Sequence, residues 1–524
     1  MGFQCGSQRC GGYQPRHQRC GRGSRRRDPH LRCSGFHQSG ALEEPERYHH
    51  LDVRHDGQWR SGVYRSGLAA KFNTPKHTIV DHYTYSLVGE GCLQEGVASE
   101  ACSLAGNLKL GKLIVFYDEN KISIDGCTDI TFTDDIKMRY ESYGWQVLRG
   151  DMYDVEGMAK LVAEAKACSD KPSLIMLKSI IGKGAPKQNT ADVHGAPLGA
   201  EGIIEAKKTL GLPTDKDFYV VPEAYKYFED KKAEFAKAEA DWNATFDAWA
   251  KENPELKKLW DDYHSDAATA EVSDVEYKVG DACATRDASG KALNVIAERF
   301  ANLVGGSADL MGPNKTAFKC DNGTFSPANR AGRTIEYGIR EFAMSAVCAG
   351  ISLHGGLRPF CATFLVFADY LRPSLRVVSL MKQPVIYVFT HDSIYVGEDG
   401  PTHQPIETMA SLRAIPGVQA IRPGDPEESM QAWNMAYASK DHPVCMAFTR
   451  QALAVYEKAD KNWKENMATK GAYVVQDAAM KKRYAIFETA KGLVLMSISS
   501  AIKRVRYEEI LHALRGSNAI SQTL

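Results

Sequence analysis

Short apolar runs alternate with amphipathic stretches through the middle of this 524-residue chain. Residues 112–118 (KLIVFYD) and 172–180 (PSLIMLKSI) are continuous apolar runs, as expected of strands buried in a parallel sheet. Between them, residues 154–167 (DVEGMAKLVAEAKA) place apolar side chains at helical spacing. This alternation of strand and helix predicts a doubly wound α/β sheet.

A charged helical stretch separates two such units. Residues 222–264 have the pattern of amphipathic helices and are expected to form a connector. In the second unit, residues 383–393 (QPVIYVFTHDS) form an apolar run that ends in polar residues, and ligand sites lie at the carboxyl ends of such strands. We therefore predict two three-layer α/β domains with mainly parallel sheets, at residues 67–270 and 271–470.

Both ends of the chain differ in composition from the middle. Residues 1–66 contain 12 Arg, no Lys and no Ile, and they show no helical or strand period. They could be a basic tail for nucleic acid or targeting, a segment that buries no core, or the product of a wrong reading frame. The abrupt change in composition favours the wrong frame. Residues 471–524 are predicted to be a remnant tail, so a third domain is expected to be missing or vestigial.

The overall composition argues against several functions. The 65 basic and 65 acidic residues balance, so no nucleic-acid partner is expected. There is no apolar run of about 18 residues to span a membrane, and no secretory signal at the start. The 13 cysteines never form a C-x-x-C pair, which argues against zinc. We expect a cytoplasmic protein with reduced thiols and no membrane partner.

The first candidate site combines residues 88–96 (VGEGCLQEG) with residues 116–126 (FYDENKISIDG). Glu90 offers a carboxylate, Asn120 an amide oxygen and Ile122 a backbone carbonyl, and such hard oxygen ligands suit Mg²⁺ or Ca²⁺. Gly91 would let the backbone approach a phosphate where a helix begins. By itself the Gly-acid-Gly triplet would mark an ordinary turn. Together with Asn120, 30 positions later, it indicates a metal-diphosphate clamp.

The second candidate site lies in residues 335–356 (IEYGIREFAMSAVCAGISLHGG), where Glu341 stands early in an apolar helical stretch. A buried Glu costs free energy unless it is paired, so its presence calls for an explanation. The plain alternative is a surface pair with Arg340. Residues 362–370 (ATFLVFADY) then add three aromatic side chains that would, taken singly, be ordinary core.

The third candidate site is the loop at residues 390–405 (THDSIYVGEDGPTHQP). His391, Asp399 and His403 occur within 13 residues of a single glycine-rich loop after a strand, which favours binding over structure. Arg450 in FTRQAL follows 59 residues after His391. Its planar guanidinium suits a phosphate, because it donates two hydrogen bonds at once.

In order and spacing these motifs resemble the transketolase family, from about residue 68 to residue 477. The resemblance implies transfer of a two-carbon ketol unit from a ketose phosphate to an aldose phosphate through a thiamine-diphosphate adduct, in the pentose phosphate pathway. It also implies a homodimer in which the diphosphate-binding domain (67–270) of one subunit faces the pyrimidine-binding domain (271–470) of the other. Dihydroxyacetone synthase shares these motifs, and a catalytically impaired or non-catalytic relative is the alternative from a different class.

The resemblance assigns roles around the cofactor. Glu341 would hydrogen-bond a ring nitrogen of the aminopyrimidine and promote its imino form, which is the step that activates the cofactor. Phe367 would stack on the pyrimidine, with Phe364 and Tyr370 in the same pocket. Asp309, in residues 305–316 (GGSADLMGPNKT), would face the cofactor.

The substrate roles follow in the same way. His391 and Arg450 would hold the sugar phosphate, with Arg286 of residues 284–296 (ATRDASGKALNVI) as a second phosphate ligand. Asp399 would contact a sugar hydroxyl, and His403 the hydroxyls at the carbonyl end of the donor. His194, in residues 193–199 (VHGAPLG), would lie near the reacting centre.

The sequence departs from the family pattern in three places. Glu90 stands where the family has Asp, and Pro313 where the family has a Ser that touches the substrate phosphate. The family's amino-terminal histidine motifs and glycine-rich diphosphate loop do not occur in residues 1–66. Pro313 would lose a contact to the substrate phosphate. Glu90 and the missing diphosphate loop would each weaken a contact to the charged diphosphate or its metal, so we expect weak thiamine-diphosphate binding by the chain as written.

Overall fold

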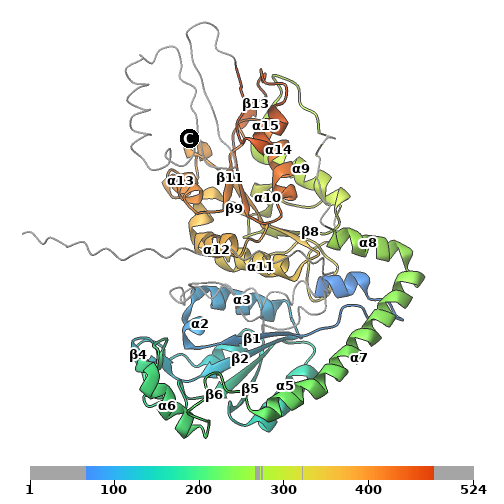
Figure 1. Cartoon of the computed structure of the whole chain (residues 1–524). Coiled ribbons are helices and arrows are strands. Elements are labelled where there is room, and N and C mark those ends of the chain that lie inside the picture. The colour runs from blue at the N-terminus through green and yellow to red at the C-terminus, as the bar shows by residue number, and fades with distance from the viewer. Residues whose placement is uncertain (1–65, 266–271, 273–274, 321–322, 477–524) are drawn as a thin grey trace, which may run out of the picture. The chain divides into compact units, whose positions relative to one another are not determined.

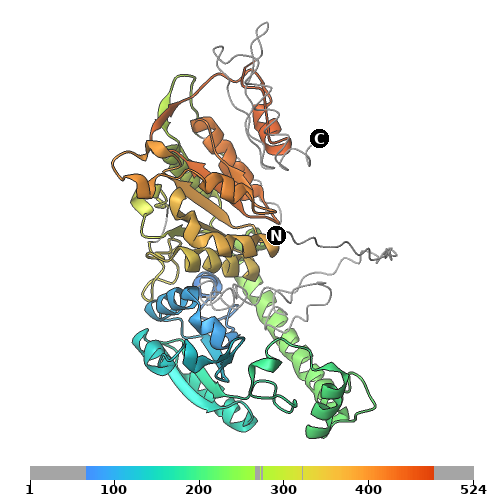
Figure 2. The ribbon, with the colours of Figure 1, turned by 90° about the vertical axis from the view of Figure 1, so that its left-hand side faces the viewer.

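The computed structural model describes residues 66–265, 272, 275–320 and 323–476. The expectations for residues 1–65 and 477–524, including the reading-frame interpretation, lie outside the described residues. The described chain forms two α/β halves, each built on one parallel sheet, with the helices of the connector between them in sequence (Figures 1 and 2).

The amino-terminal half contains a four-stranded sheet in the order β1-β2-β6-β5, parallel throughout. Alternate residues of β2 face opposite sides: Val115 packs toward the side of α3, and Ile114 toward the side of α5. Helices therefore cover both faces, giving three layers. The elements are β1 (Thr84–Val88), α2 (Glu90–Gln94), α3 (Gly96–Asn107), β2 (Leu113–Glu119), β3 (Ile122–Ser123), β4 (Gly126–Cys127), η1 (Thr128–Ile130), α4 (Ile136–Ser142), β5 (Gln146–Asp151), α5 (Val155–Ala167), β6 (Ser173–Lys178) and η2 (Ala191–Val193).

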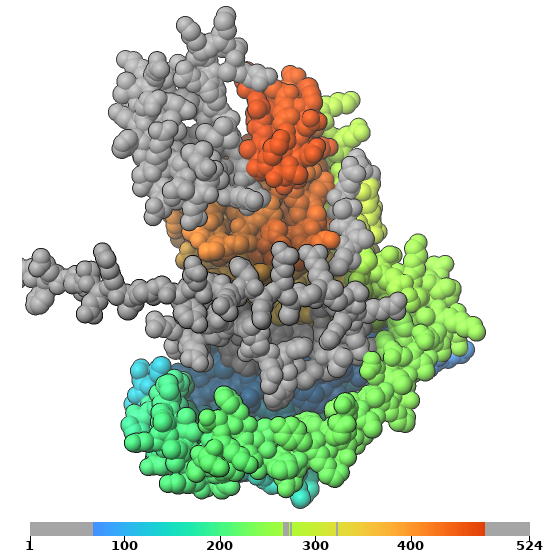
Figure 3. Space-filling view, in the orientation of Figure 1, coloured from blue at the N-terminus to red at the C-terminus, as the bar shows by residue number. Residues whose placement is uncertain are grey.

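The connector consists of α6 (Gly199–Thr209), α7 (Pro222–Glu252) and α8 (Pro254–His264). Proline begins both α7 and α8, where its missing N–H leaves no helical hydrogen bond unmade. Trp249 of α7 and Trp260 of α8 pack edge-on against Phe72, which fixes the connector to the amino-terminal half. The outer side chains of α6 and α7 are visible at the surface (green in Figure 3).

The carboxyl-terminal half contains a five-stranded parallel sheet in the order β11-β12-β10-β9-β8. On β10, Val388 packs with α9 and α14, whereas Tyr387 and Phe389 pack with α11 and α12 on the other face. The elements are β7 (Ala282–Ala284), α9 (Thr285–Arg299), β8 (Leu303–Ser307), α10 (Met311–Asn314), α11 (Glu341–His354), β9 (Arg358–Phe364), η3 (Leu365–Phe367), α12 (Ala368–Leu380), β10 (Ile386–Thr390), η4 (Ile394–Val396), η5 (Pro401–His403), α13 (Thr408–Arg413), β11 (Gln419–Ile421), α14 (Pro426–Ala438), β12 (Val444–Phe448), β13 (Ala452–Ala454) and α15 (Trp463–Thr469).

The prediction of two three-layer α/β units with mainly parallel sheets is confirmed. The apolar runs at 112–118 and 172–180 are β2 and β6, and the periodic stretch at 154–167 is α5. Within the part of the chain that the structure describes, no helix has the length and apolarity needed to cross a membrane.

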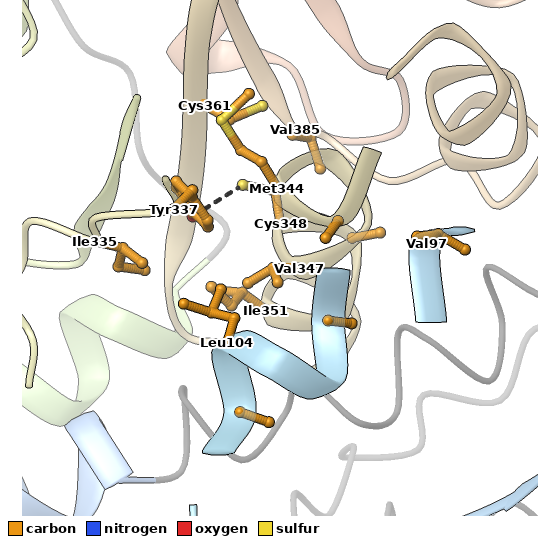
Figure 4. Packing of buried hydrophobic residues seen from close by; sticks show 14 of the residues in the cluster. Val97, Leu104, Ile335, Tyr337, Met344, Val347, Cys348, Ile351, Cys361 and Val385 are labelled. Carbon is orange, nitrogen blue, oxygen red and sulfur yellow. Dashed lines mark hydrogen bonds between the residues drawn. The ribbon is translucent and has the colours of Figure 1, made fainter. Parts of the chain in front are cut away.

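One hydrophobic cluster joins the two halves through α3 and α11. Val97 and Leu104 of α3 belong to the same buried cluster as Met344, Val347 and Ile351 of α11, and Leu104 lies beside Val347 and Ile351 in Figure 4. α11 is almost entirely apolar and buried, so it has no face left to turn toward water. Packing α3 against α11 therefore positions the first turn of α11, which carries the candidate residue Glu341, against the amino-terminal half.

Residues 471–476, which we grouped with the tail, are packed on the carboxyl-terminal half. The backbone of Val475 accepts a hydrogen bond from Ala459 at 2.9 Å, and the Tyr473 hydroxyl donates to the buried carboxylate of Glu428. The ordered structure therefore extends at least six residues past the boundary proposed from sequence.

Candidate active site

The parallel register of β1 and β2 brings Glu90 and Asn120 to one edge of the amino-terminal sheet. Val88, the last residue of β1, pairs with Tyr117, two residues before β2 ends at Glu119. Glu90 is the first residue of α2 after β1, and Asn120 directly follows β2. The two residues, 30 positions apart in sequence, thus reach the same place through the sheet rather than through local structure.

The Glu90 carboxylate is buried and hydrogen-bonded at both oxygens. One oxygen accepts from the backbone N–H of Lys121 at 2.6 Å, and the other accepts from the Tyr117 hydroxyl. Burial raises the pKa of Glu90, while these two donors act in the opposite direction. Lys121 adopts a left-handed conformation with φ 63°, which turns its N–H toward Glu90.

The residues at this edge have the chemistry of a magnesium-diphosphate site. Glu90 supplies a carboxylate, while Asn120 supplies an amide oxygen that accepts from the Ile122 N–H at 2.9 Å. All candidate ligands are hard oxygens, including the Ile122 carbonyl, and this suits Mg²⁺. A Cβ built on Gly91 meets nothing within 4 Å, so the start of α2 has open space beside its backbone. The described residues contain no cluster of three or more His, Cys, Asp or Glu that could hold a metal ion.

Glu341 is the first residue of α11, and its side chain is 8% exposed. Burial raises the pKa of this carboxyl, and the nearby carboxylate of Glu100 on α3 raises it further. Glu100 also accepts a hydrogen bond from the Ala343 N–H at 2.9 Å, which caps the start of α11. Arg340 points away from Glu341, because its guanidinium donates to Ser103 at 3.1 Å and to the backbone of Tyr337. The alternative interpretation of Glu341 as the partner of Arg340 in a surface ion pair is therefore wrong.

The carboxyl ends of β10 and β12 carry His391 and Arg450. His391 directly follows β10, is buried, and adopts a left-handed conformation with φ 58°. Its Nε2 lies 3.3 Å from Nη1 of Arg286, which also donates to the backbone carbonyl of Pro313 at 3.3 Å. The backbone carbonyl at position 313, which any residue there would present, thus helps to hold Arg286.

The charges around His391 keep its imidazole neutral. Burial lowers its pKa to about 4, and the cation of Arg286 contributes next. Asp399 acts in the opposite direction, whereas Arg450 and His403 add to the lowering. Four of the other predicted substrate residues, Arg286, Asp399, His403 and Arg450, therefore lie within electrostatic range of His391.

Aromatic rings connect these substrate residues to the predicted cofactor pocket. The Phe364 ring stacks on the His391 ring with centroids 3.7 Å apart, and lies nearly parallel to Phe367 at 5.9 Å. His403 meets Phe367 edge-on at 5.3 Å. Tyr370 lies 6.1 Å from Phe367 and is 64% exposed. The sequence assigned the aromatics to the cofactor and the histidines to the substrate, and the structure makes them one contiguous cluster.

Arg450 is held by an acidic neighbour from the same loop. Its Nη2 donates to Glu398 at 2.7 Å, and Gly397, with φ 91°, lies beside the guanidinium. Backbone hydrogen bonding lowers the pKa of Glu398, with Arg450 as the next cause, so the pair is ionised at neutral pH. An incoming phosphate therefore has to compete with Glu398 for this cation.

Two predicted residues stand apart from the cluster. His194 follows η2 in the amino-terminal half, and among the described residues no hydrogen bond or ring contact joins it to His391 or His403. Asp309 lies between β8 and α10, exposed, with a left-handed φ of 59°. A non-glycine residue in this conformation is often found at functional sites. The predicted role of Asp309 is therefore supported by its position just after β8, and not by a contact with the cluster.

Sequence reasoning missed several residues that shape the site. They are Glu100, Tyr117, Thr390, Asn314 and Glu398. Tyr117 was foreseeable only from the strand register, which sequence does not give. Glu398 lies next to Asp399 in the loop at residues 390–405, so its acidic charge in that loop could have indicated a partner for Arg450.

Comparison with known proteins shows which family this chain resembles. A model described as "Transketolase, thiamine diphosphate binding domain" matches residues 60–267, and one described as "Transketolase, pyrimidine binding domain" matches residues 281–455. The chain is 50% identical over 452 residues to the transketolase of Treponema pallidum, covering 85% of this chain and 68% of that protein. It is 47% identical to the transketolase of Streptococcus pyogenes over 78% of this chain and 56% of that protein.

Solved structures give the same result. The transketolase from Leishmania mexicana superposes with a TM-score of 0.78 at 38% identity, covering 82% of this chain and 64% of that one. A transketolase from Pichia stipitis in complex with sedoheptulose 7-phosphate gives a TM-score of 0.75 at 38% identity, with the same coverages. This chain thus spans 56–68% of the length of these relatives.

The electrostatics of His391 yield a pH prediction. Because its pKa lies below the ordinary 6.5, the folded protein favours the neutral imidazole, and His391 destabilises the fold increasingly as the pH falls from 6.5 to about 4. Replacing Arg286 by Met removes a cation and should raise the pKa of His391 without restoring 6.5, since burial remains. A histidine NMR titration measures this, with Arg149→Met in the amino-terminal half as control. An unchanged pKa in Arg286→Met would contradict the assignment.

Proposed function

Because this chain belongs to the transketolase family, we propose that it transfers a two-carbon ketol unit from a ketose phosphate to an aldose phosphate with thiamine diphosphate. One observation carries the proposal. Arg286, His391, Asp399, His403 and Arg450 come from three separate parts of the sequence and meet at the carboxyl ends of β10 and β12. Such an array of cations, imidazoles and one carboxylate suits a phosphorylated polyhydroxy substrate.

In this proposal each substrate group has a partner. Arg286 and Arg450 bind the phosphate as paired donors, with His391 between them. Asp399 accepts a hydrogen bond from a sugar hydroxyl, and His403, beside Phe367, lies where the carbonyl end of the donor would be. His194 is proposed to approach the same centre from the amino-terminal half.

The residues also fit the cofactor. Bound thiamine diphosphate would supply the nucleophilic carbon that accepts the two-carbon unit. Glu341, whose carboxyl pKa is raised by burial, would donate a hydrogen bond to its pyrimidine. Phe367 would stack on the ring with Phe364 and Tyr370 beside it, and Asp309 would face it. These residues bind, orient and hold a proton, which is the protein's share of such chemistry.

At the amino-terminal half, Glu90, Asn120 and the Ile122 carbonyl are proposed to hold Mg²⁺ or Ca²⁺ against the diphosphate, beside Gly91. The matches at 60–267 and 281–455 support a division into a diphosphate-binding domain at 67–270 and a pyrimidine-binding domain at 271–470. The described cysteines are free thiols, which supports the proposed cytoplasmic setting. The proposed role in the pentose phosphate pathway rests on the family.

We further propose a homodimer in which each cofactor lies between two subunits. Apolar side chains near Glu341 and His403 are exposed in the single chain: Ile339 is 77%, Tyr370 64% and Ile406 78% exposed. Exposed apolar side chains beside a polar site support a surface that a partner covers. Light scattering should find a dimer when cofactor is bound. A monomer with full cofactor affinity would contradict this arrangement.

Two alternatives are separated by experiment. Dihydroxyacetone synthase differs only in the acceptor, so parallel assays with aldose phosphates and formaldehyde distinguish it. A catalytically impaired or non-catalytic chain is favoured by Pro313 and by the missing amino-terminal histidine motifs, and would bind sugar phosphate without turnover.

The role of Glu341 is tested by Glu341→Gln. The amide keeps the shape of the side chain but has no carboxyl proton to share, so turnover with fructose 6-phosphate as donor should fall by about 10²–10⁴-fold while the fold is retained. Glu336→Gln, at an exposed position before α11, is the matched control and should leave turnover unchanged. Near-normal turnover in Glu341→Gln would remove this residue from the mechanism.

The metal site is tested by changing the length and charge of residue 90. In Glu90→Asp the carboxylate withdraws from Tyr117 and Lys121, which compete with a metal for its oxygens. Calorimetric titration with thiamine diphosphate and Mg²⁺ should show tighter binding than in the unaltered chain. Glu90→Gln, which lacks the charge, should weaken binding about tenfold or more. Equal affinities for all three, with and without Mg²⁺, would exclude Glu90 as a metal ligand.

A further inference from the structure

A row of buried hydrogen bonds runs behind His391, away from the substrate side. Nδ1 of His391 lies 2.9 Å from the Thr390 hydroxyl, and that hydroxyl donates to Oδ1 of Asn314 at 2.7 Å. Nδ2 of Asn314 donates to Ser307 at 3.2 Å, and Ser307 lies 2.7 Å from the Thr316 hydroxyl. These side chains are almost completely buried, so water does not compete for their hydrogen bonds.

The donors and acceptors in this row fix where the imidazole proton lies. Arg286 can only donate, so Nε2 of His391, 3.3 Å from Nη1, has to accept. A neutral imidazole has one N–H, which is then at Nδ1 and donates to Thr390. The Thr390 hydroxyl must therefore donate its own hydrogen bond to Asn314, whose side-chain carbonyl oxygen faces Thr390. The Arg286 guanidinium at one end of the row and the Asn314 carbonyl at the other end both require that each hydrogen bond is donated from the Arg286 side toward Asn314.

The remaining neighbours of His391 are consistent with a neutral ring. Arg450 and His403 lower the pKa of His391, whereas the acidic group of Asp399 raises it. Asp392, the next residue, is engaged by Arg422 at 2.7 Å. The Phe364 ring covers one face of the imidazole. Burial and Arg286 accordingly lower the pKa of His391 to about 4.

We propose that Asn314 is a positioning residue that acts through Thr390 to hold His391 as the Nδ1–H tautomer, so that a sugar phosphate binds together with one proton. Nε2 then presents a lone pair and cannot donate to a phosphate dianion. One proton from solvent forms a bond to Nε2 or to the facing phosphate oxygen and is shared between them, and no other bond changes. The proton uptake rests on the proposed substrate site, whereas the tautomer does not.

The coupling has a defined pH dependence. A phosphate monoester is a dianion above its second pKa of about 6. Above that pH, binding takes up one proton, so affinity falls about tenfold for each unit of rising pH until the bound pair itself titrates. An Nε2–H imidazole would donate directly to the dianion, and affinity would be independent of pH in this range.

The tautomer is tested without any ligand by long-range ¹⁵N NMR of the histidine rings in the full chain. The His391 signal is identified by its loss in His391→Gln. We expect Nδ1–H in the unaltered chain and in Thr390→Ser, which keeps the hydroxyl. Asn314→Leu frees the Thr390 hydroxyl to donate to Nδ1, and a population of Nε2–H should appear. An Nε2–H ring in the unaltered chain would overturn the proposal, and an unchanged ring in Asn314→Leu would remove Asn314 from its role.

The proton uptake is tested by calorimetry with fructose 6-phosphate at pH 8, in two buffers of different ionisation enthalpy and without thiamine diphosphate, so that no turnover occurs. We expect an uptake of about one proton per site for the unaltered chain, a smaller uptake for Asn314→Leu, and none with fructose. Binding without proton uptake would overturn the coupling. Failure of fructose 6-phosphate to bind at all would contradict the proposed substrate site, and the tautomer would then be decided by the spectrum.

Discussion

The common register of β9, β10 and β12 is the constraint on which the candidate site depends. Phe364 pairs with Thr390, and Thr390 pairs with Phe448, so three strands end in one row. The residues just beyond that row leave the sheet together, which places His391 under the Phe364 ring and near Arg450. Because side chains alternate along a strand, a slip of one residue in β10 would turn its side chains to the opposite faces and withdraw His391 from its partners.

The same register also divides the core, and this links the site to the rest of the fold. Tyr387 and Phe389 of β10 pack toward α11, whereas Val388 packs toward α9 and α14. α11 in turn packs against α3 of the amino-terminal half, and Glu100 of α3 caps its first turn. Burial at this helix junction is what raises the pKa of Glu341, with Glu100 adding to it. The chemistry proposed for Glu341 is therefore a consequence of how the two halves pack.

Much of the fold was predictable because parallel strands buried on both faces are continuous apolar runs. The runs at 112–118, 172–180 and 383–393 are recognisable for this reason, and each overlaps a strand. The candidate residues were found from motif order and spacing. His391, Arg286, Asp399, His403 and Arg450 indeed lie together. Their roles remain predictions until a ligand is bound.

What the sequence did not predict depends on long-range geometry. The left-handed conformations of Asp309 and His391 are imposed by the surrounding fold and have no local glycine signal. The contacts of Glu100 with α11 and of Asn314 with Thr390 join residues 243 and 76 positions apart, so no periodicity reveals them. The pair between Glu341 and Arg340, which adjacent charges suggested, fails because α11 begins with the two side chains pointing to different partners.

A crystal structure of the full chain with bound fructose 6-phosphate tests the central claim most directly. The account predicts that the phosphate lies within hydrogen-bond distance of Arg286, His391 and Arg450 together, and that Arg450 has exchanged Glu398 for the phosphate. A phosphate bound elsewhere, with the pair between Arg450 and Glu398 intact, would contradict it.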